Sequence, residues 1–261
     1  AGSALAQKVQ AGTIQAAQHS ISNFAPFAPV TDLINIPYWV GTNQKFINLV
    51  TSDIWRKEVH SKVASSGFKV LWYVVIDPRV VATRKGVSGP IKTPEQTKGI
   101  KFRVPGSKIL AQFYQLLGAN PTPMPWPIYT ELEQGVIDGQ ENPLWVMTEY
   151  KFYEIQKYMT LTRHVYSPHI DVASLMWWNT IDAPTQAMIL SAIREAADFQ
   201  RRDNREKDAA RLVYLKEKGM EVEESPDLAA FRTKLVSLQS NAIYSDPRVN
   251  DLLRRMLEAT R

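Results

Sequence analysis

Apolar residues recur at close to helical spacing in one long segment near the start of the chain. This segment, 43–66, is predicted to be a helix that ends at Gly67, because apolar residues three or four positions apart line one helix face. Its apolar positions are Phe46, Val50, Ile54, Val59 and Val63.

Capping residues, prolines and glycines mark further helices. Ser107 and Asp182 are the clearest caps, and Gly118 and Gly219 follow the ends of the helices that they begin. The helices predicted in this way are 107–117, 127–135, 143 to near 158, 182 to near 219, and two that begin at 225–226 and 246–247.

Other apolar runs predict strands. The near-continuous run 68–76 indicates a strand that is buried on both faces. A strand with one solvent-exposed face would instead alternate apolar and polar residues. A short strand should end at Arg103, a buried one should cover 136–138, and 165–178 should be extended. Helices and strands alternate without an internal repeat, so the predicted class is α/β with mainly parallel sheets. The 261 residues, 44% of them apolar, suffice for two domains.

Composition excludes several kinds of function. The formal net charge is +5, but the charges are scattered and no basic block marks a nucleic-acid-binding arm. The densest charged run, 201–208, mixes both signs and is predicted to be a solvated helix face. No apolar run approaches the ~20 residues that cross a bilayer. The absence of cysteine excludes thiolate chemistry, disulfides and cysteine-ligated metals.

The segment 99–143 carries the most distinctive chemistry. It places Arg103 at the end of a short apolar strand, directly before a Pro-Gly-Ser turn and a helix, and it closes on Asn142 followed by proline. Arginine grips a carboxylate through two parallel hydrogen bonds, and ligands bind at strand ends in open α/β sheets. The segment therefore predicts a binding site for an organic anion.

Signals for catalysis or a metal are weak by comparison. The sequence has no G-x-S-x-G, H-E-x-x-H or P-loop motif, and no cofactor is predicted. His164 and His169 lie five positions apart on an apparent strand and face opposite sides, so they do not predict a shared metal. A hydrolase or lyase acting on organic acids would need a base near Arg103, for which Asp138 and Glu141 are the local candidates.

Three motifs in order, GIKFRVPGS, GANPTPMPW and GVIDGQENP, resemble the solute-binding proteins of tripartite ATP-independent periplasmic (TRAP) transporters, the DctP family. The resemblance implies a two-lobed, type II-like clamp of the periplasmic-binding-protein kind. Such a clamp is exported to the bacterial periplasm, captures a small organic acid and delivers it, as a monomer, to TRAP membrane subunits. Presentation of the ligand to a membrane sensor kinase stays open as an alternative.

The same resemblance implies two domains with the ligand cleft between them. Domain I would comprise 1–78 and 166–207, and domain II would comprise 79–165 and 208–261. Against the family pattern the chain opens at Ala1 inside what resembles the second helix, so the family's first strand and helix are expected to be missing.

The motifs also imply which residues contact the ligand. Arg103 matches the family's carboxylate-binding arginine. The alternative is that it forms an ion pair with an aspartate in the core. Arg79 matches a second arginine that often faces the ligand. The alternative is that Arg79 is a surface residue of a crossover connection. Asn142 would orient the carboxylate, since an amide offers both a donor and an acceptor. Trp126 would pack on the ligand's carbon skeleton, or simply fill a proline-rich turn.

Polar residues elsewhere would line the other side of the cleft. His19, Ser20 and Asn23 follow the strand after Gly12, where a helix cap is the plainer explanation. The remaining ligand-binding candidates are Ser107, Tyr166 and His169.

Overall fold

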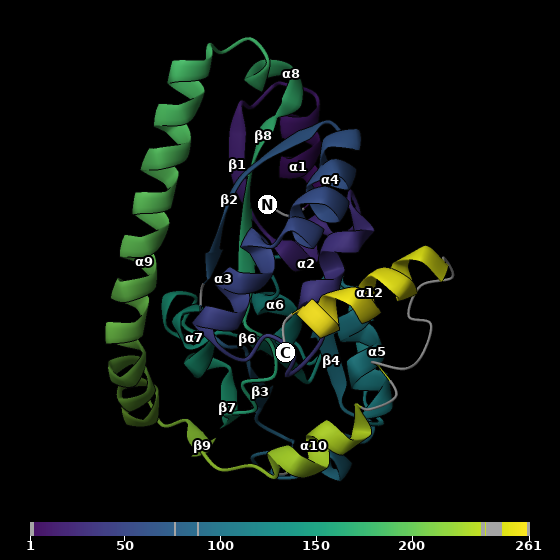
Figure 1. The fold of residues 1–261 in the computed structure, drawn as a ribbon. Helices are drawn as coiled ribbons and strands as arrows, with labels where there is room; N and C mark the ends of the chain where they lie inside the picture. The colour runs from purple at the N-terminus through teal and green to yellow at the C-terminus, as the bar shows by residue number, and fades with distance from the viewer. Residues whose placement is uncertain (1–2, 76, 88, 236–237, 239–246, 260–261) are drawn as a thin grey trace.

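Two separate β-sheets organise the chain (Figure 1). The structure is a computed structural model, and it describes residues 3–75, 77–87, 89–235, 238 and 247–259. The smaller sheet has the strand order β1 (Ala16–Ser20), β8 (Pro168–Ser174), β2 (Phe68–Val75). The larger sheet has the order β5 (Asn120–Pro123), β4 (Lys101–Val104), β6 (Gly139–Asn142), β3 (Val80–Arg84), β7 (Gln156–Thr160), β9 (Glu221–Glu223).

Each sheet contains one strand that runs against its neighbours. Strand β8 is antiparallel to β1 and β2, and β3 is antiparallel to β6 and β7. The remaining pairings, β4 with β5, β4 with β6 and β7 with β9, are parallel. All other strands of each sheet therefore point the same way, and the predicted two-lobed α/β class with mainly parallel strands is confirmed. The reversed strands are those that the chain enters on crossing between sheets, from β2 into β3 and from β7 into β8.

Helices pack around both sheets. They are α1 (Ser3–Gln10), α2 (Ile21–Phe24), α3 (Asn43–Thr51), α4 (Ser61–Ser65), α5 (Lys108–Leu116), α6 (Tyr129–Glu133), α7 (Leu144–Glu149), α8 (Leu175–Trp178), α9 (Ala183–Glu217), α10 (Leu228–Lys234) and α12 (Pro247–Ala259). Shorter helical turns are η1 (Pro29–Asn35), η2 (Trp55–His60), η3 (Pro94–Thr97) and η4 (Phe152–Glu154).

Helix α9 runs along both lobes (Figure 1). Its 35 residues span about 50 Å at ~1.5 Å per residue. Its first half packs Ile189 and Ile193 against Leu71 of the smaller sheet, whereas Leu215 lies in the core of the larger sheet. The helix is therefore a third connection between the lobes, beside the crossings at 77–79 and 161–167.

The C-terminal helix α12 packs on the first lobe. Leu252, Leu253 and Met256 are buried in the core around β1, β8 and β2, and Arg255 lies 3.4 Å from Glu58. The predicted domain division stays a prediction, but its assignment of all of 208–261 to domain II does not agree with this packing. The apolar residues of α12 do not by themselves indicate which of the two lobes the helix packs against.

Several element predictions are confirmed and others are wrong. Strand β2, the caps of α5 and α9 and their glycine ends lie where the sequence places them. The segment 136–138 forms no strand and leads into β6, because the amides of Val136 and Ile137 donate to the Glu131 carbonyl of α6 and not to a neighbouring strand. The helix from Pro143 stops at Glu149, since Lys151 adopts a left-handed φ of 53° and the chain continues into β7.

Further predictions differ in extent or in their first residue, or lie partly outside the described residues. The segment 43–66 is helical but interrupted at Ser52, whose hydroxyl bonds the Leu49 carbonyl. The extended segment ends at Ser174, which caps α8. The predicted start at 225–226 shifts to the Asp227 cap of α10. Asp246 lies outside the described residues, and α12 begins at Pro247.

Gly139 of β6 is the most closely packed of the described glycines, between β4 and β3. A Cβ there would lie 2.6 Å from Phe102 Cε1 and 2.8 Å from the Ala82 carbonyl oxygen. We expect Gly139→Ala to lower the free energy of unfolding by about 1–3 kcal/mol, because backbone atoms cannot move aside as a flexible side chain does. Urea unfolding checks this.

Gly41→Ala is the matched control. No atom lies within 4 Å of the position that a Cβ would take at Gly41, so the stability of this variant should change little. Equal stabilities for the two variants would contradict the packing argument.

Candidate functional site

A cavity of about 290 Å³ lies where the two lobes meet. Eight of the ten predicted ligand-binding residues line it: His19, Ser20, Asn23, Arg79, Arg103, Trp126, Asn142 and His169. The sequence reasoning missed eight others: Leu5, Gln18, Pro105, Pro143, Trp145, Val146, Tyr150 and Ser167. Of these, Trp145 follows the QENP motif so closely that the motif itself was an available signal.

Strand ends bring the lining residues together. The first lobe contributes the end of β1, with His19 and Ser20, and the start of β8, with His169. The second lobe contributes Arg103 from the end of β4 and Asn142 from the end of β6. The side chain of Ser20 makes no capping hydrogen bond, so the helix-cap explanation does not hold for it.

Arg103 is the central charge of the cavity. Its side chain is 2% exposed, its Nε donates to the Met124 carbonyl at 3.0 Å, and its Nη2 has no partner among the residues described. Its guanidinium carbon lies 5.8 Å from the centroid of the Trp126 ring. Burial, and then the charge of Arg79, lower the pKa of Arg103 to about 10, so the group stays charged at neutral pH. No aspartate of the described chain pairs with it, which removes that alternative.

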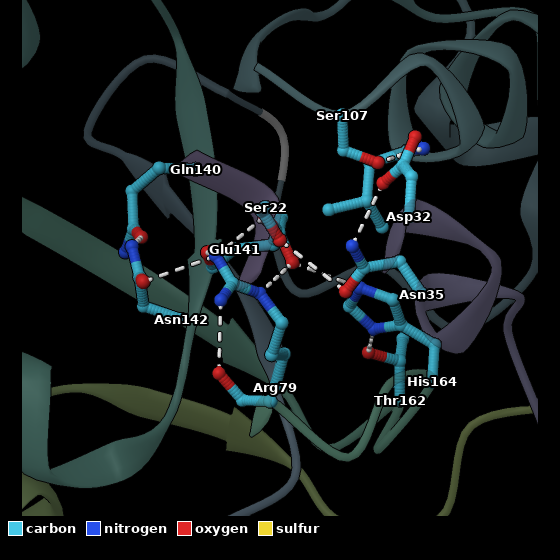
Figure 2. A network of polar contacts seen from close by, with 12 residues as sticks. Ser22, Asp32, Asn35, Arg79, Ser107, Gln140, Glu141, Asn142, Thr162 and His164 are labelled. Atoms are coloured by element: carbon cyan, nitrogen blue, oxygen red, sulfur yellow. Dashed lines mark hydrogen bonds and ion pairs between the residues drawn. The ribbon is translucent and has the colours of Figure 1, made fainter. Parts of the chain in front are cut away.

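Arg79 is also buried, but its charge is matched (Figure 2). Its Nε and Nη2 donate to the two carboxylate oxygens of Glu141, the latter at 2.7 Å. Nη2 also lies 3.1 Å from Asn142 Oδ1, and Nη1 donates to Ser167 Oγ at 2.9 Å. Arg79 therefore holds Asn142 and the second crossing in place beside Arg103, and it is not the surface residue that the sequence left as an alternative.

Glu141 is the buried partner that makes this arrangement possible. Burial alone would raise its pKa, but the charge of Arg79 and hydrogen bonds from His164 and Arg79 lower it below the ordinary value. His164 Nε2 lies 3.2 Å from the carboxylate, and its Nδ1 lies 2.8 Å from the Thr162 hydroxyl. Because a carboxylate only accepts, Nε2 is the donor and Thr162 donates to Nδ1.

A second polar network joins the lobes next to the first (Figure 2). Asp32 of η1 accepts from Asn35 Nδ2 at 2.8 Å and from the Ile109 amide at 3.3 Å. Ser22 Oγ donates to Asn35 Oδ1 at 3.2 Å. Asp32 therefore lies at the start of α5, where the helix dipole favours a negative charge.

Two of the predicted ligand-binding residues do not line this cavity. Ser107 does not line the cavity, because its hydroxyl accepts from the Leu110 amide at 3.0 Å and caps α5. Tyr166 lies elsewhere, with its hydroxyl donating to Asn43 Oδ1 at 2.5 Å. Successive residues of an extended chain point to opposite sides, so Ser167 faces the cavity in its place.

Aromatic side chains form one wall of the cavity. The Trp126 and Tyr150 rings meet edge to face at 4.8 Å, and Trp126 also packs 5.7 Å from Phe152. The Trp145 ring lies 6.4 Å from Tyr150. Trp126 thus serves both as packing and as cavity surface.

The carboxyl groups that an enzyme would need are both engaged. Glu141 is bonded to Arg79 and His164, and Asp138 accepts from Arg84 at 2.9 Å and from the Lys101 amide at 3.0 Å. Neither lines the cavity. The described residues also contain no group of three or more histidine, aspartate and glutamate side chains that could hold a metal ion.

Comparisons with known proteins agree with this geometry. The DctP sequence family, bacterial extracellular solute-binding protein family 7, matches residues 2–245. The chain belongs to this family. It is 31% identical over 257 residues to the 2,3-diketo-L-gulonate-binding periplasmic protein YiaO of Escherichia coli K12, covering 98% of this chain and 77% of that protein. It is 26% identical to the sialic acid-binding periplasmic protein SiaP of Vibrio cholerae, covering 90% and 72%.

Solved structures of TRAP periplasmic solute-binding proteins have the same fold. One from Polaromonas sp. JS666, bound to D-erythronate, superposes with a TM-score of 0.88 at 26% identity and covers 97% of this chain and 81% of its own. One from Bordetella, with density interpreted as pantoate, gives a TM-score of 0.87 at 29% identity and covers 98% and 83%. This chain is therefore a solute-binding protein of the TRAP type. Within its described part, no helix is both long and apolar enough to span a membrane.

Burial affects the protonation of all four histidines of this chain. Burial lowers the pKa of His19 and His60 to about 4 and of His169 to about 3, and it also lowers the pKa of His164. The unfolded chain takes up protons near the ordinary value of 6.5, whereas the folded chain does so only at lower pH. We therefore expect the free energy of unfolding to fall as the pH drops from about 6.5 to 4.

Urea unfolding at several pH values measures this slope. Asp77, whose burial raises its pKa to about 6, offsets a part of it. His60→Gln should make the slope shallower, because one titrating group is removed outside the cavity. A stability that is constant over this range would contradict the assignment.

Proposed function

We propose that this protein captures an organic acid anion in the bacterial periplasm and delivers it to TRAP membrane subunits. The observation that carries the proposal is the unmatched charge of Arg103. Its Nη2 is buried at the cavity without a partner in the described chain, and no aspartate or glutamate lines the cavity. A ligand carboxylate supplies both the charge and the acceptor that this group lacks.

The neighbouring groups support the same ligand. Asn142 lies beside Arg103 with its amide oxygen on Arg79 and its Nδ2 donating to Gln140 at 2.6 Å. Trp126 covers the guanidinium and offers its face to a carbon skeleton. Several proteins similar to this chain are named for, or bound to, acids that carry carboxylates, among them diketogulonate, sialic acid and D-erythronate.

Capture couples to closure of the lobes in this proposal. The cavity takes its cation and aromatic wall from one lobe and neutral polar groups from the other, so a bound ligand contacts both. Each crossing also holds a non-glycine residue with left-handed backbone, Asp77 with φ 90° and Arg163 with φ 43°. Such positions store strain and are common at hinges. The monomeric state belongs to the same proposal.

Uptake measurements test delivery directly. Membrane vesicles that contain the cognate TRAP membrane subunits should accumulate the acid only when this protein is added. Uptake that is independent of the protein would contradict the proposed role in transport.

Arg103→Ala should weaken binding of the acid by about 2–5 kcal/mol, which is ~30-fold or more, because the carboxylate is left buried without its charge partner. Arg103→Lys should recover only part of this loss, since a point charge cannot copy two parallel hydrogen bonds. Calorimetry with an acid found by a thermal-shift screen measures both.

Arg56→Ala is the control for the change in net charge, because Arg56 is exposed and pairs only locally with Asp53. Affinity within threefold of the wild type for Arg103→Ala would refute the site.

Ligand binding should also reduce the radius of gyration. A ligand that contacts both lobes stabilises the closed form in proportion to the contacts made only there. Small-angle scattering with and without saturating acid measures the change. Identical scattering profiles would indicate a rigid preformed pocket.

A further inference from the structure

Three side-chain amides form a continuous chain of hydrogen bonds from Arg79 across the larger sheet. Arg79 Nη2 donates to Asn142 Oδ1 at 3.1 Å, and Asn142 Nδ2 donates to Gln140 Oε1 at 2.6 Å (Figure 2). Gln140 Nε2 donates to Gln156 Oε1 at 2.9 Å, and Gln156 Nε2 donates to the Ala82 carbonyl, also at 2.9 Å. We call the side-chain amides of residues 142, 140 and 156 the amide chain.

The two ends of the amide chain fix its direction. A guanidinium only donates, so Arg79 requires the oxygen of Asn142. A backbone carbonyl only accepts, so Ala82 requires the nitrogen of Gln156. Reversal of any one amide would place a donor against a donor or an oxygen against an oxygen. The amide of Asn142 therefore has a single orientation, which the bonds at both ends of the chain support.

A β-bulge in β7 brings Gln156 into the amide chain. Ala82 of β3 pairs with Met159 of β7. Two residues further along β3, Arg84 pairs with Gln156, which lies three residues from Met159. Strand residues alternate between the two faces of a sheet, and a bulge shifts this alternation by one residue. Gln156 therefore lies on the face of Ala82, where regular alternation would place Lys157.

Both glutamines of the amide chain are buried outside the cavity. Gln140 is 0% exposed and Gln156 is 2% exposed, whereas Asn142 is 7% exposed and lines the cavity. Gln140 Nε2 also lies 3.1 Å from Met147 Sδ, so both ends of this side chain are satisfied. A buried polar network in which every member is paired specifies one arrangement of its side chains. The amide chain connects the sheet interior to the cavity through Asn142.

The orientation of Asn142 determines what it can offer to an anion. Its Oδ1 accepts from Arg79, whose charge Glu141 already matches. Its Nδ2 carries two hydrogens, and Gln140 accepts one of them. The second N–H is the donor that remains for an anion held by Arg103. Reversal of the amide would exchange this nitrogen for an oxygen, which repels a carboxylate.

We propose that Gln140 and Gln156 are positioning residues for binding, which hold the Asn142 amide so that its nitrogen donates to the bound anion. The inference rests on the proposed function, because it requires an organic anion in the cavity. It assigns a role in binding to two residues that do not line the cavity. One of them, Gln156, lies outside all three of the sequence motifs that indicate the site.

Calorimetry on the whole chain tests the role of Gln156. The probe is whichever of D-erythronate, L-galactonate, D-glucuronate and sialic acid raises the melting temperature most. Gln156→Met keeps the length of the side chain but removes its hydrogen bonds, and it should weaken binding of the probe at least about threefold. Asn142→Ala should weaken binding at least about tenfold. In the Asn142→Ala background, Gln156→Met should change binding by less than about 1.5-fold, because no amide is left to position.

Gln186→Met is the matched control. Gln186 also donates to backbone carbonyls, those of Trp178 and Ile181, but it neither lines the cavity nor joins the amide chain. Its replacement should lower the melting temperature without changing the affinity for the probe. An unchanged affinity in folded Gln156→Met would overturn the inference. An equal loss of affinity with and without Asn142 would overturn it as well.

Two variants of Gln140 provide a second measurement, which decides if Gln156→Met does not fold. Gln140→Met breaks the amide chain. In Gln140→Glu, the neutral carboxylic acid keeps a donor and an acceptor and continues the chain, whereas the ionised carboxylate only accepts. Burial raises the pKa of a carboxyl group, so mild acid favours the neutral form.

Acid should therefore restore binding in one of these variants and not in the other. At pH ~5.5, Gln140→Glu should bind the probe at least about threefold more tightly than Gln140→Met, and this advantage should shrink as the pH rises. A packing defect alone would not be relieved by acid. Equal affinities of the two variants at the acidic pH would overturn the inference.

The outcomes separate this inference from the proposed function. If Arg103→Ala abolishes binding of the probe but Gln156→Met leaves it unchanged, organic-acid capture stands and the positioning role is refuted. If no acid binds, or if Arg103→Ala leaves binding unchanged, the proposed function fails and the inference fails with it.

Discussion

Two guanidinium groups are buried beside a single carboxylate at the meeting point of the lobes, and the rest of the site depends on this imbalance. Glu141 satisfies Arg79 through paired hydrogen bonds, and the resulting unit holds Asn142 and Ser167. Arg103 is left with a buried charge and a nitrogen that no described residue pairs. Burying an uncompensated charge is costly, so the fold retains it where an external anion completes it.

The sheet topology determines where that charge lies. One strand of each sheet is reversed, and the chain enters these two strands on crossing between lobes. The ends of β4, β6 and β1 and the start of β8 therefore converge on one cavity. Helix α9 and the contact of Asp32 with the start of α5 restrict how far the lobes separate.

The two lobes differ in what they contribute to recognition. The second lobe supplies the cation and the aromatic wall of Trp126, Trp145 and Tyr150, whereas the first supplies neutral groups such as His19 and Asn23. This division separates capture of a carboxylate from reading of the remaining atoms.

Local motifs specify turns, caps and strand ends, so the family, the α/β class, the helix caps at Ser107 and Asp182 and eight residues of the cavity could be predicted from the sequence. The sequence does not predict which charged side chains are paired with an opposite charge, because this pairing depends on the tertiary fold. Glu141 and Arg79 are 62 positions apart, and only the antiparallel pairing of β3 with β6 brings them together. The fold also determines that Ser107 is confined to its helix and that Ser167 rather than Tyr166 faces the cavity. These roles depend on the direction of a side chain and on contacts distant in sequence, which a pattern of residue types along the chain does not encode.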